Sequence, residues 1–132
     1  MKTIIVDDEE LAIRQFEMEC KKLPWVNIVG RFHHAQEALE YVEKEEIEAA
    51  FLDIELPGMN GILLGRKLRE LHPKLVVIFL TGYDTYTMDA LHMKADYYLM
   101  KPYSSEDFRE VMQNARLLTR RQKKRVFIRT FG

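Results

Sequence analysis

Three aspartates are placed where they could hold a metal ion and accept a phosphoryl group. Asp7 and Asp8 directly follow a short apolar run at residues 3–6, and Asp53 closes a second run at residues 49–52. The carboxyl ends of parallel strands meet at one edge of a sheet, so these side chains would converge if the two runs are neighbouring strands. Carboxylates without His or Cys partners favour Mg²⁺, which relieves their mutual repulsion. We therefore expect a Mg²⁺ site formed by Asp7, Asp8 and Asp53.

Asp53 is the candidate phosphoryl acceptor at this site. A carboxylate can form an aspartyl phosphate, and that transfer requires positive charge around the phosphoryl oxygens. Mg²⁺ and Lys101, which follows another apolar run, would supply this charge. The Thr81 hydroxyl could donate to a phosphoryl oxygen, and Gly82 beside it leaves its own backbone N–H accessible. Together these residues predict phosphoryl transfer to Asp53.

The segments that must position these residues alternate between short apolar runs and amphipathic stretches. The apolar runs are too short for helices, and they predict strands at residues 3–6, 26–32, 49–52, 75–80 and 97–100. The amphipathic stretches predict helices around residues 12–23, 35–44, 64–71 and 85–93, and from Ser105 onward. This alternation predicts an α/β fold with a parallel sheet and right-handed crossovers. The strand order 2-1-3-4-5, which is common for such sheets, would make the first and third strands neighbours.

The composition of the chain is that of one soluble domain. A chain of 132 residues that is 47% hydrophobic has the apolar material for a single core. Its longest apolar run, residues 75–80, is far below the roughly 18 residues of a membrane span, so we expect no membrane contact. The single cysteine, Cys20, cannot form an internal disulfide, and the N-terminus does not resemble a signal peptide. These features favour a cytoplasmic location.

Charge is distributed unevenly along the chain. The first 110 residues hold all 21 acidic residues and 13 basic ones, whereas residues 111–132 hold seven basic residues and no acidic one. Such a basic end can bind nucleic acid, but a solvated helix end that runs into a linker is more common. Alternating apolar and polar residues at 126–131 predict a short strand. We expect a compact domain over residues 1–121, followed at residues 122–132 by a basic linker and the start of a further unit.

Four motifs in the chain resemble those of the receiver domains of bacterial two-component response regulators. They are Ile4-Ile5-Val6-Asp7-Asp8-Glu9, Asp53-Ile54-Glu55-Leu56-Pro57-Gly58-Met59-Asn60-Gly61, Leu80-Thr81-Gly82 and Lys101-Pro102. Each motif is weak alone, but the four in this order and spacing are highly specific. The resemblance covers residues 1–120 and implies a flavodoxin-like, doubly wound (βα)5 three-layer sandwich.

The resemblance implies how Asp53 is phosphorylated. Asp53 would take a phosphoryl group from a sensor histidine kinase. The backbone carbonyl of Glu55 would join Asp7, Asp8 and Asp53 as a ligand of Mg²⁺. Glu55 stands two residues after Asp53, and Tyr83 stands two residues after Thr81. In the family, these two positions influence how water reaches the acyl phosphate, and both are bulky here, so we expect slow autodephosphorylation.

The resemblance also implies a phosphate-binding set and a switch. Lys101 and Thr81 would contact the phosphate, with the backbone N–H of Gly82 beside them, and the peptide bond before Pro102 would be cis. On phosphorylation, the Thr81 hydroxyl would move toward the phosphate and Tyr98 would turn inward. An equally good interpretation is that Tyr98 is a half-buried strand residue whose neighbour, residue 97, faces the opposite side of the sheet.

Partners follow from the same resemblance. Phosphorylation would change the surface near residues 84–91 and 96–112 and promote a homodimer. Receiver domains usually control an attached effector, and residues 125–132 resemble the opening strand of the winged-helix DNA-binding modules found in some regulators. We therefore expect DNA contact and transcriptional control only through that missing domain. The chain itself would be no enzyme beyond phosphorylating and dephosphorylating its own Asp53.

Two other functions are compatible with parts of the sequence. A standalone adaptor would bind a partner without phosphorylation, but the intact set of Asp7, Asp53 and Lys101 argues against it. A phosphatase that forms an aspartyl phosphate would need an acid–base carboxylate two residues after its nucleophile. Glu55 stands there, but such enzymes usually carry Asp at that position and a larger cap.

Overall fold

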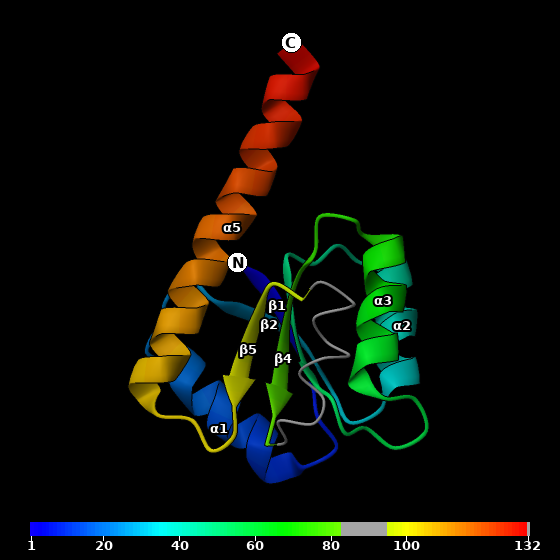
Figure 1. Ribbon diagram of the computed structural model, residues 1–132, viewed down its shortest axis with the longest axis vertical. Helices are drawn as coiled ribbons and strands as arrows, with labels where there is room; N and C mark the ends of the chain where they lie inside the picture. The colour runs from blue at the N-terminus through cyan, green and yellow to red at the C-terminus, as the bar shows by residue number, and fades with distance from the viewer. Residues whose placement is uncertain (83–94, 132) are drawn as a thin grey trace.

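The computed structural model describes residues 1–82 and 95–131, with the backbone alone from residue 124 onward (Figure 1). The elements are β1 (Lys2–Val6), α1 (Glu10–Cys20), β2 (Asn27–Phe32), α2 (Ala35–Lys44), β3 (Ala49–Asp53), α3 (Gly61–Leu71), β4 (Val76–Thr81), β5 (Tyr97–Met100) and α5 (Ser105–Phe131). The strands form one parallel sheet in the order β2-β1-β3-β4-β5. The predicted α/β class and strand order are therefore confirmed. The helix predicted at residues 85–93 lies outside the described residues.

Helices cover both faces of the sheet and give the molecule three layers. α2 and α3 lie on one side, and α1 and α5 lie on the other (Figure 1). β3 and β4 are buried along their whole length because both of their faces are covered. Successive side chains of a strand point to opposite faces, and Phe51 and Leu52 accordingly belong to different hydrophobic clusters.

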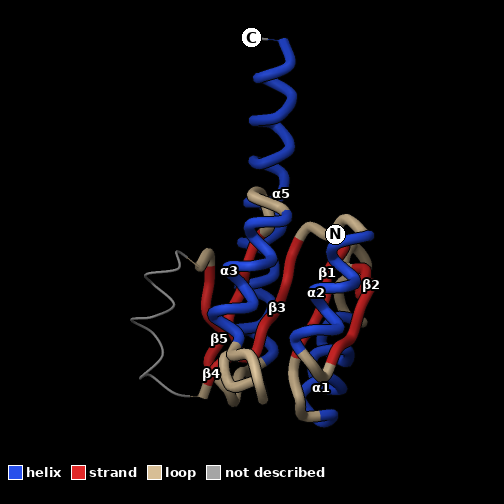
Figure 2. The backbone as a smooth tube through the Cα atoms, turned by 90° about the vertical axis from the view of Figure 1, so that its right-hand side faces the viewer, coloured by secondary structure: helices blue, strands red, loops and turns tan. Residues whose placement is uncertain are grey.

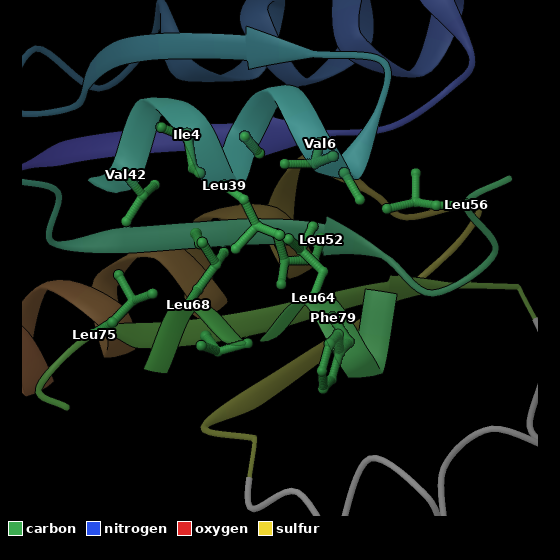
Figure 3. Packing of buried hydrophobic residues seen from close by; sticks show 14 of the residues in the cluster. Ile4, Val6, Leu39, Val42, Leu52, Leu56, Leu64, Leu68, Leu75 and Phe79 are labelled. Atoms are coloured by element: carbon green, nitrogen blue, oxygen red, sulfur yellow. The ribbon is translucent and has the colours of Figure 1, made fainter. Parts of the chain in front are cut away.

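The hydrophobic cluster beneath α2 and α3 fixes α3 against the sheet. Leu64 and Leu68 of α3 are fully buried, and they belong to the same cluster as Leu52 of β3 and Phe79 of β4. Figure 3 shows these side chains together with those of α2. Burial of a leucine side chain stabilises the fold by about 1.5–3 kcal/mol. This packing therefore holds α3 firmly against the sheet, with its first turn near the end of β3.

Aromatic packing on the other face secures the start of α5. The Phe16 ring lies 4.9 Å from the Phe51 ring and 5.6 Å from the Phe108 ring, centroid to centroid. Tyr103 stacks on Phe108 at 5.7 Å. Aromatic pairs of this kind contribute about 0.5–1.5 kcal/mol beyond their buried area. The cluster thus anchors the segment between β5 and α5, which includes Lys101.

The last helix is longer than the sequence pattern predicts. α5 is continuous from Ser105 to Phe131 and runs past the edge of the sheet (Figure 2), so the strand predicted at residues 126–131 is wrong. Arg, Gln and Lys at residues 120–125 are good helix formers, and neither Gly nor Pro occurs within α5 to end it. Lys123 Nζ lies 2.7 Å from Glu48 Oε2 and so joins α5 to the residue before β3. None of the described helices combines the length and apolar character needed to cross a bilayer.

Candidate functional site

The predicted site residues stand at the carboxyl edge of the sheet. Asp7 directly follows β1, Asp53 ends β3, Thr81 ends β4 and Lys101 directly follows β5. Parallel strands put all of these ends on one side. The Asp7 N–H donates to the Phe32 carbonyl at 3.0 Å and so ties this loop to the end of β2. The topology alone therefore gathers side chains that are as many as 94 residues apart in the sequence.

Lys101 bridges the two buried carboxylates. Its ammonium Nζ lies 2.6 Å from Asp7 Oδ2 and 3.3 Å from Asp53 Oδ2. The second oxygen of each carboxylate accepts a backbone N–H two residues further on, from Glu9 to Asp7 at 2.9 Å and from Glu55 to Asp53 at 3.0 Å. The Asp7 side chain is fully buried, and that of Asp53 is 8% exposed. Four hydrogen bonds therefore fix the directions of two carboxylates that repel each other.

Burial and neighbouring charges affect the pKa values of Asp53 and Lys101 differently. Burial raises the pKa of Asp53 to about 6, and the charge of Asp7 adds to this effect, while Lys101 and the Glu55 N–H oppose it. Burial alone would lower the pKa of Lys101, but its hydrogen bonds and charge interactions with Asp7 and Asp53 raise that pKa above its ordinary value. The site thus favours the charged form of Lys101 and disfavours the ionised form of Asp53.

The acidic residues at this edge fit a hard divalent cation. Oxygen atoms of Asp7, Asp8, Glu9 and Asp53 all lie within 4.8 Å of one another. Asp8 and Glu9 are exposed, so they can be reached from solvent. A set of oxygen ligands without His or Cys suits Mg²⁺. Glu9 was not among the Mg²⁺ ligands expected from the sequence. Its place directly after Asp7 and Asp8 was the signal for its membership of this group.

The candidate phosphate contacts lie beside this group. Thr81 is 2% exposed, and its backbone carbonyl accepts the Lys101 N–H at 2.8 Å. Gly82 follows it, and a Cβ built there would meet Lys101 O at 3.8 Å, an ordinary contact distance. The peptide bond between Lys101 and Pro102 is cis, as the resemblance implies. Tyr83 lies outside the described residues. The roles of Thr81 and Gly82 toward a phosphate and of the Glu55 carbonyl toward a metal stay predictions.

The two tyrosines of β5 face opposite sides of the sheet. Tyr97 packs on the side of α5, where its hydroxyl donates to the Asn114 carbonyl at 3.5 Å. Tyr98 packs on the side of α3, with its ring centroid 6.4 Å from that of Phe79. The Tyr98 hydroxyl is buried without a hydrogen-bond partner among the described residues, and burial raises its pKa. Tyr98 therefore stands half-buried, and its part in a switch stays a prediction.

Fold and site together define a class of signalling domain. Residues 3–113 match the family model described as the response regulator receiver domain. The chain belongs to this family.

Individual relatives agree with this class. The chain is 30% identical over 113 residues to the transcriptional regulatory protein YpdB of Escherichia coli, covering 86% of this chain and 46% of YpdB. It is 32% identical over 115 residues to the sensory transduction protein LytT of Enterococcus faecalis, covering 87% and 48%. It spans about half the length of these curated relatives. The response regulatory domain of protein mrkE from Klebsiella pneumoniae has a TM-score of 0.80 and 27% identity, covering 94% of this chain and 99% of that one.

Proposed function

We propose that this receiver domain is switched by phosphorylation of Asp53, with Mg²⁺ as cofactor and a sensor histidine kinase as phosphodonor. The observation that carries the proposal is the contact of one ammonium, Lys101 Nζ, with both Asp7 and Asp53 at the carboxyl edge of the sheet. A cation in this place can neutralise charge on an incoming phosphoryl group. The exposed oxygens of Asp8 and Glu9 beside it would complete a Mg²⁺ site with the two buried carboxylates.

The chemical step is a transfer from one nucleophile to another. An oxygen of Asp53 attacks the phosphorus of a phosphohistidine, and an O–P bond forms as the N–P bond breaks. The imidazole nitrogen keeps the electron pair of the broken bond and takes up a proton. Bound Mg²⁺ would supply positive charge to the phosphoryl oxygens. Lys101 then exchanges its contact with Asp53 for one with a phosphoryl oxygen, and Thr81 donates its hydroxyl to another.

The readout would be a change of surface rather than turnover of a substrate. Phosphorylation adds a charge of about -1.5 to -2 and strong acceptor oxygens. Thr81 and Tyr98, which lie on the adjacent strands β4 and β5, would respond to it. The altered face around β5 and the first turns of α5 would favour a homodimer and control an attached transcriptional output domain. The names of two relatives, transcriptional regulatory protein YpdB and sensory transduction protein LytT, support a regulatory role.

Intact-mass measurement tests the proposal. Wild-type protein is incubated with acetyl phosphate and Mg²⁺ beside Asp53→Asn and beside a sample with EDTA. The wild type should gain one phosphoryl group per chain, and the other two samples should gain none. An unlabelled wild type would favour a phospho-independent adaptor. Continuous hydrolysis of a generic phosphate ester would favour a phosphatase.

The exposed face of α1 is the surface on which we expect the kinase to dock. Leu11 and Met18 are 77% and 65% exposed, and their spacing of seven residues puts them on one face of α1. A groove of about 310 Å³ begins at Leu11 and Gln15 and reaches Lys101 and Pro102. Exposed apolar side chains beside a reactive group are typical of an interface. A helix of the kinase with an apolar face could bind here and present its phosphohistidine to Asp53.

Replacing Leu11 and Met18 by serine should separate docking from chemistry. Loss of two apolar anchors costs about 1–2 kcal/mol each, so transfer from a purified, autophosphorylated histidine kinase should slow by at least about tenfold. This kinase is chosen from a panel of purified histidine kinases as the one that transfers its phosphoryl group to the wild type fastest. Labelling by acetyl phosphate should stay within about twofold. The matched control replaces Leu63 and Leu71 of α3, which are 42% and 43% exposed, by serine. Equal transfer rates for both double variants would place the docking surface elsewhere.

A further inference from the structure

The first residue of α3 touches the backbone of the candidate phosphoryl acceptor. Gly61 is buried, and a Cβ built on it would lie 2.1 Å from Asp53 O and 2.8 Å from Asp53 C. The Gly61 N–H donates to the Ile54 carbonyl at 2.9 Å. α3 therefore begins directly against the peptide group that joins Asp53 to Ile54. No side chain fits between them, because nonbonded carbon and oxygen atoms need more than about 3 Å.

The surroundings of Gly61 differ from those of other glycines in the chain. A Cβ at Gly58 would meet open space, although its φ of +82° disfavours other residues. A Cβ at Gly30 would come within 2.5 Å of the Phe32 ring, which is a side chain and can turn away. At Gly61 the opposing atoms are backbone. A side chain at residue 61 could therefore be accommodated only if the backbone moved.

We propose that Gly61 is a positioning residue that sets where the Asp53 carboxylate stands relative to Lys101 and Asp7. The inference rests on the proposed function of Asp53. The end of β3 is held on its other side by β4, because the Ile54 N–H donates to the Leu80 carbonyl at 3.1 Å. A methyl group at residue 61 must therefore displace either α3 or the peptide group after Asp53.

α3 resists such a displacement more strongly than the peptide group does. Leu64 and Leu68 are fully buried beneath it, and Ile62 is 5% exposed. Retreat of the helix would open space around all three, whereas rotation of the peptide group would chiefly weaken one hydrogen bond, from the Ile54 N–H to the Leu80 carbonyl. That rotation moves the Asp53 side chain, whose contact with Lys101 at 3.3 Å is already the longer of the two ammonium contacts. A misplacement of about 1 Å in a reacting group can cost about 100-fold in rate.

The test compares Gly61→Ala with Gly30→Ala in the full chain. Gly30 is also buried and crowded, by the Phe32 ring rather than by backbone, and it lies on β2, away from Asp53, so it controls for loss of stability. The folded fraction is measured by urea titration with the fluorescence of Trp25. Labelling by acetyl phosphate at saturating Mg²⁺ is measured by intact mass and expressed per folded molecule. The amide resonance of Glu55, whose N–H donates to Asp53 Oδ1, reports the position of the carboxylate without any phosphodonor.

Gly61→Ala should be labelled about 100-fold more slowly than the wild type, with a displaced Glu55 amide resonance. Gly30→Ala should unfold at lower urea but keep its labelling rate within about twofold and its Glu55 resonance in place. If Gly61→Ala does not fold in buffer alone, trimethylamine N-oxide is added to restore the compact state. A labelling rate for Gly61→Ala within threefold of the wild type, or an unmoved Glu55 resonance, would overturn the inference. A wild type without label refutes the proposed function instead, and the Glu55 resonance then decides the role of Gly61.

Discussion

Replacing Lys101 by methionine should lower the free energy of unfolding of the metal-free protein by about 3 kcal/mol at pH 7. The Lys101 ammonium contacts Asp7 at 2.6 Å and Asp53 at 3.3 Å, and the Asp7 side chain is fully buried. Without Lys101, two neighbouring carboxylates would stand in a site of low dielectric without that cation. Removing one partner from a buried pair costs about 3–5 kcal/mol. We place the effect at the low end because a carboxyl group can take up a proton.

The pH dependence and the metal dependence of this effect follow from the same charges. Asp7 and Asp53 raise the pKa of Lys101 above its ordinary value of 10.5 despite its burial. While its partner carboxylates are ionised, the stability that Lys101 contributes is therefore fully present below pH 10.5, and it is lost at high pH only as pH rises through the higher folded pKa. At pH 7 the whole effect is measurable. Mg²⁺ should restore much of the loss, because it supplies positive charge to the same carboxylates.

Urea titrations followed by Trp25 fluorescence measure this prediction, in EDTA and in excess Mg²⁺. Lys67→Met is the matched control, because Lys67 is an exposed lysine of α3. It should change the unfolding free energy by no more than about 0.5 kcal/mol. Equal stabilities of Lys101→Met and the wild type in EDTA would contradict the view that Lys101 holds the two carboxylates together.

Replacing Asp53 by asparagine should have the opposite effect and stabilise the metal-free protein by about 1–2 kcal/mol at pH 7.5. Burial raises the pKa of Asp53 from 3.8 to about 6. Each pKa unit corresponds to about 1.4 kcal/mol, so the ionised carboxylate costs the folded state up to about 3 kcal/mol. Asparagine keeps an oxygen for the Glu55 N–H but weakens the contact with Lys101. The net gain is therefore smaller than the full cost.

This gain should depend on pH in a defined direction. A carboxyl group whose folded pKa is raised loses stability as pH rises from the unfolded pKa to the folded one. The wild type should lose stability between pH 3.8 and about 6 through Asp53, and Asp53→Asn should not. The difference between them should be largest above pH 6 and close to zero near pH 4. Glu43→Gln, at an exposed site of α2, is the control. A difference that does not vary with pH would contradict the role of burial at Asp53.

The placement of the main site residues could be predicted from the sequence because topology determines it. A parallel sheet in the order 2-1-3-4-5 puts the ends of β1, β3 and β5 at one edge, and the apolar runs before Asp7, Asp53 and Lys101 mark those ends. An apolar run before each aspartate, together with the strand order, was therefore enough to predict where that aspartate lies. The helix over residues 12–23 was predicted less well, because α1 is Glu10–Cys20 and the buried Leu23 lies beyond it. A buried residue in the loop after a helix can continue the helix's apolar spacing, so the pattern does not mark where the helix ends.

The finer arrangement could not be predicted, since it depends on distances that spacing does not encode. The pattern places Lys101 near two carboxylates but does not show that it lies closer to Asp7 than to Asp53. The contact between Gly61 and the Asp53 carbonyl depends on how the loop at residues 54–60 closes, and the sequence shows only a glycine at a helix start. The alternation at residues 126–131 misled because the same segment also continues a long run of helix formers.

The unbroken course of α5 means that a small angular change near the acidic site becomes a large movement elsewhere. The helix starts four residues after Lys101 and contains 27 residues, so it is about 40 Å long at about 1.5 Å per residue. A tilt of about 10° at its first turn would carry its far end through about 7 Å. The pair of exposed Lys123 and half-buried Glu48 adds little resistance, so such a tilt would be opposed chiefly by the buried packing of Met112, Ala115 and Thr119. α5 thus has the dimensions of a lever arm that amplifies motion from one end of the domain to the other.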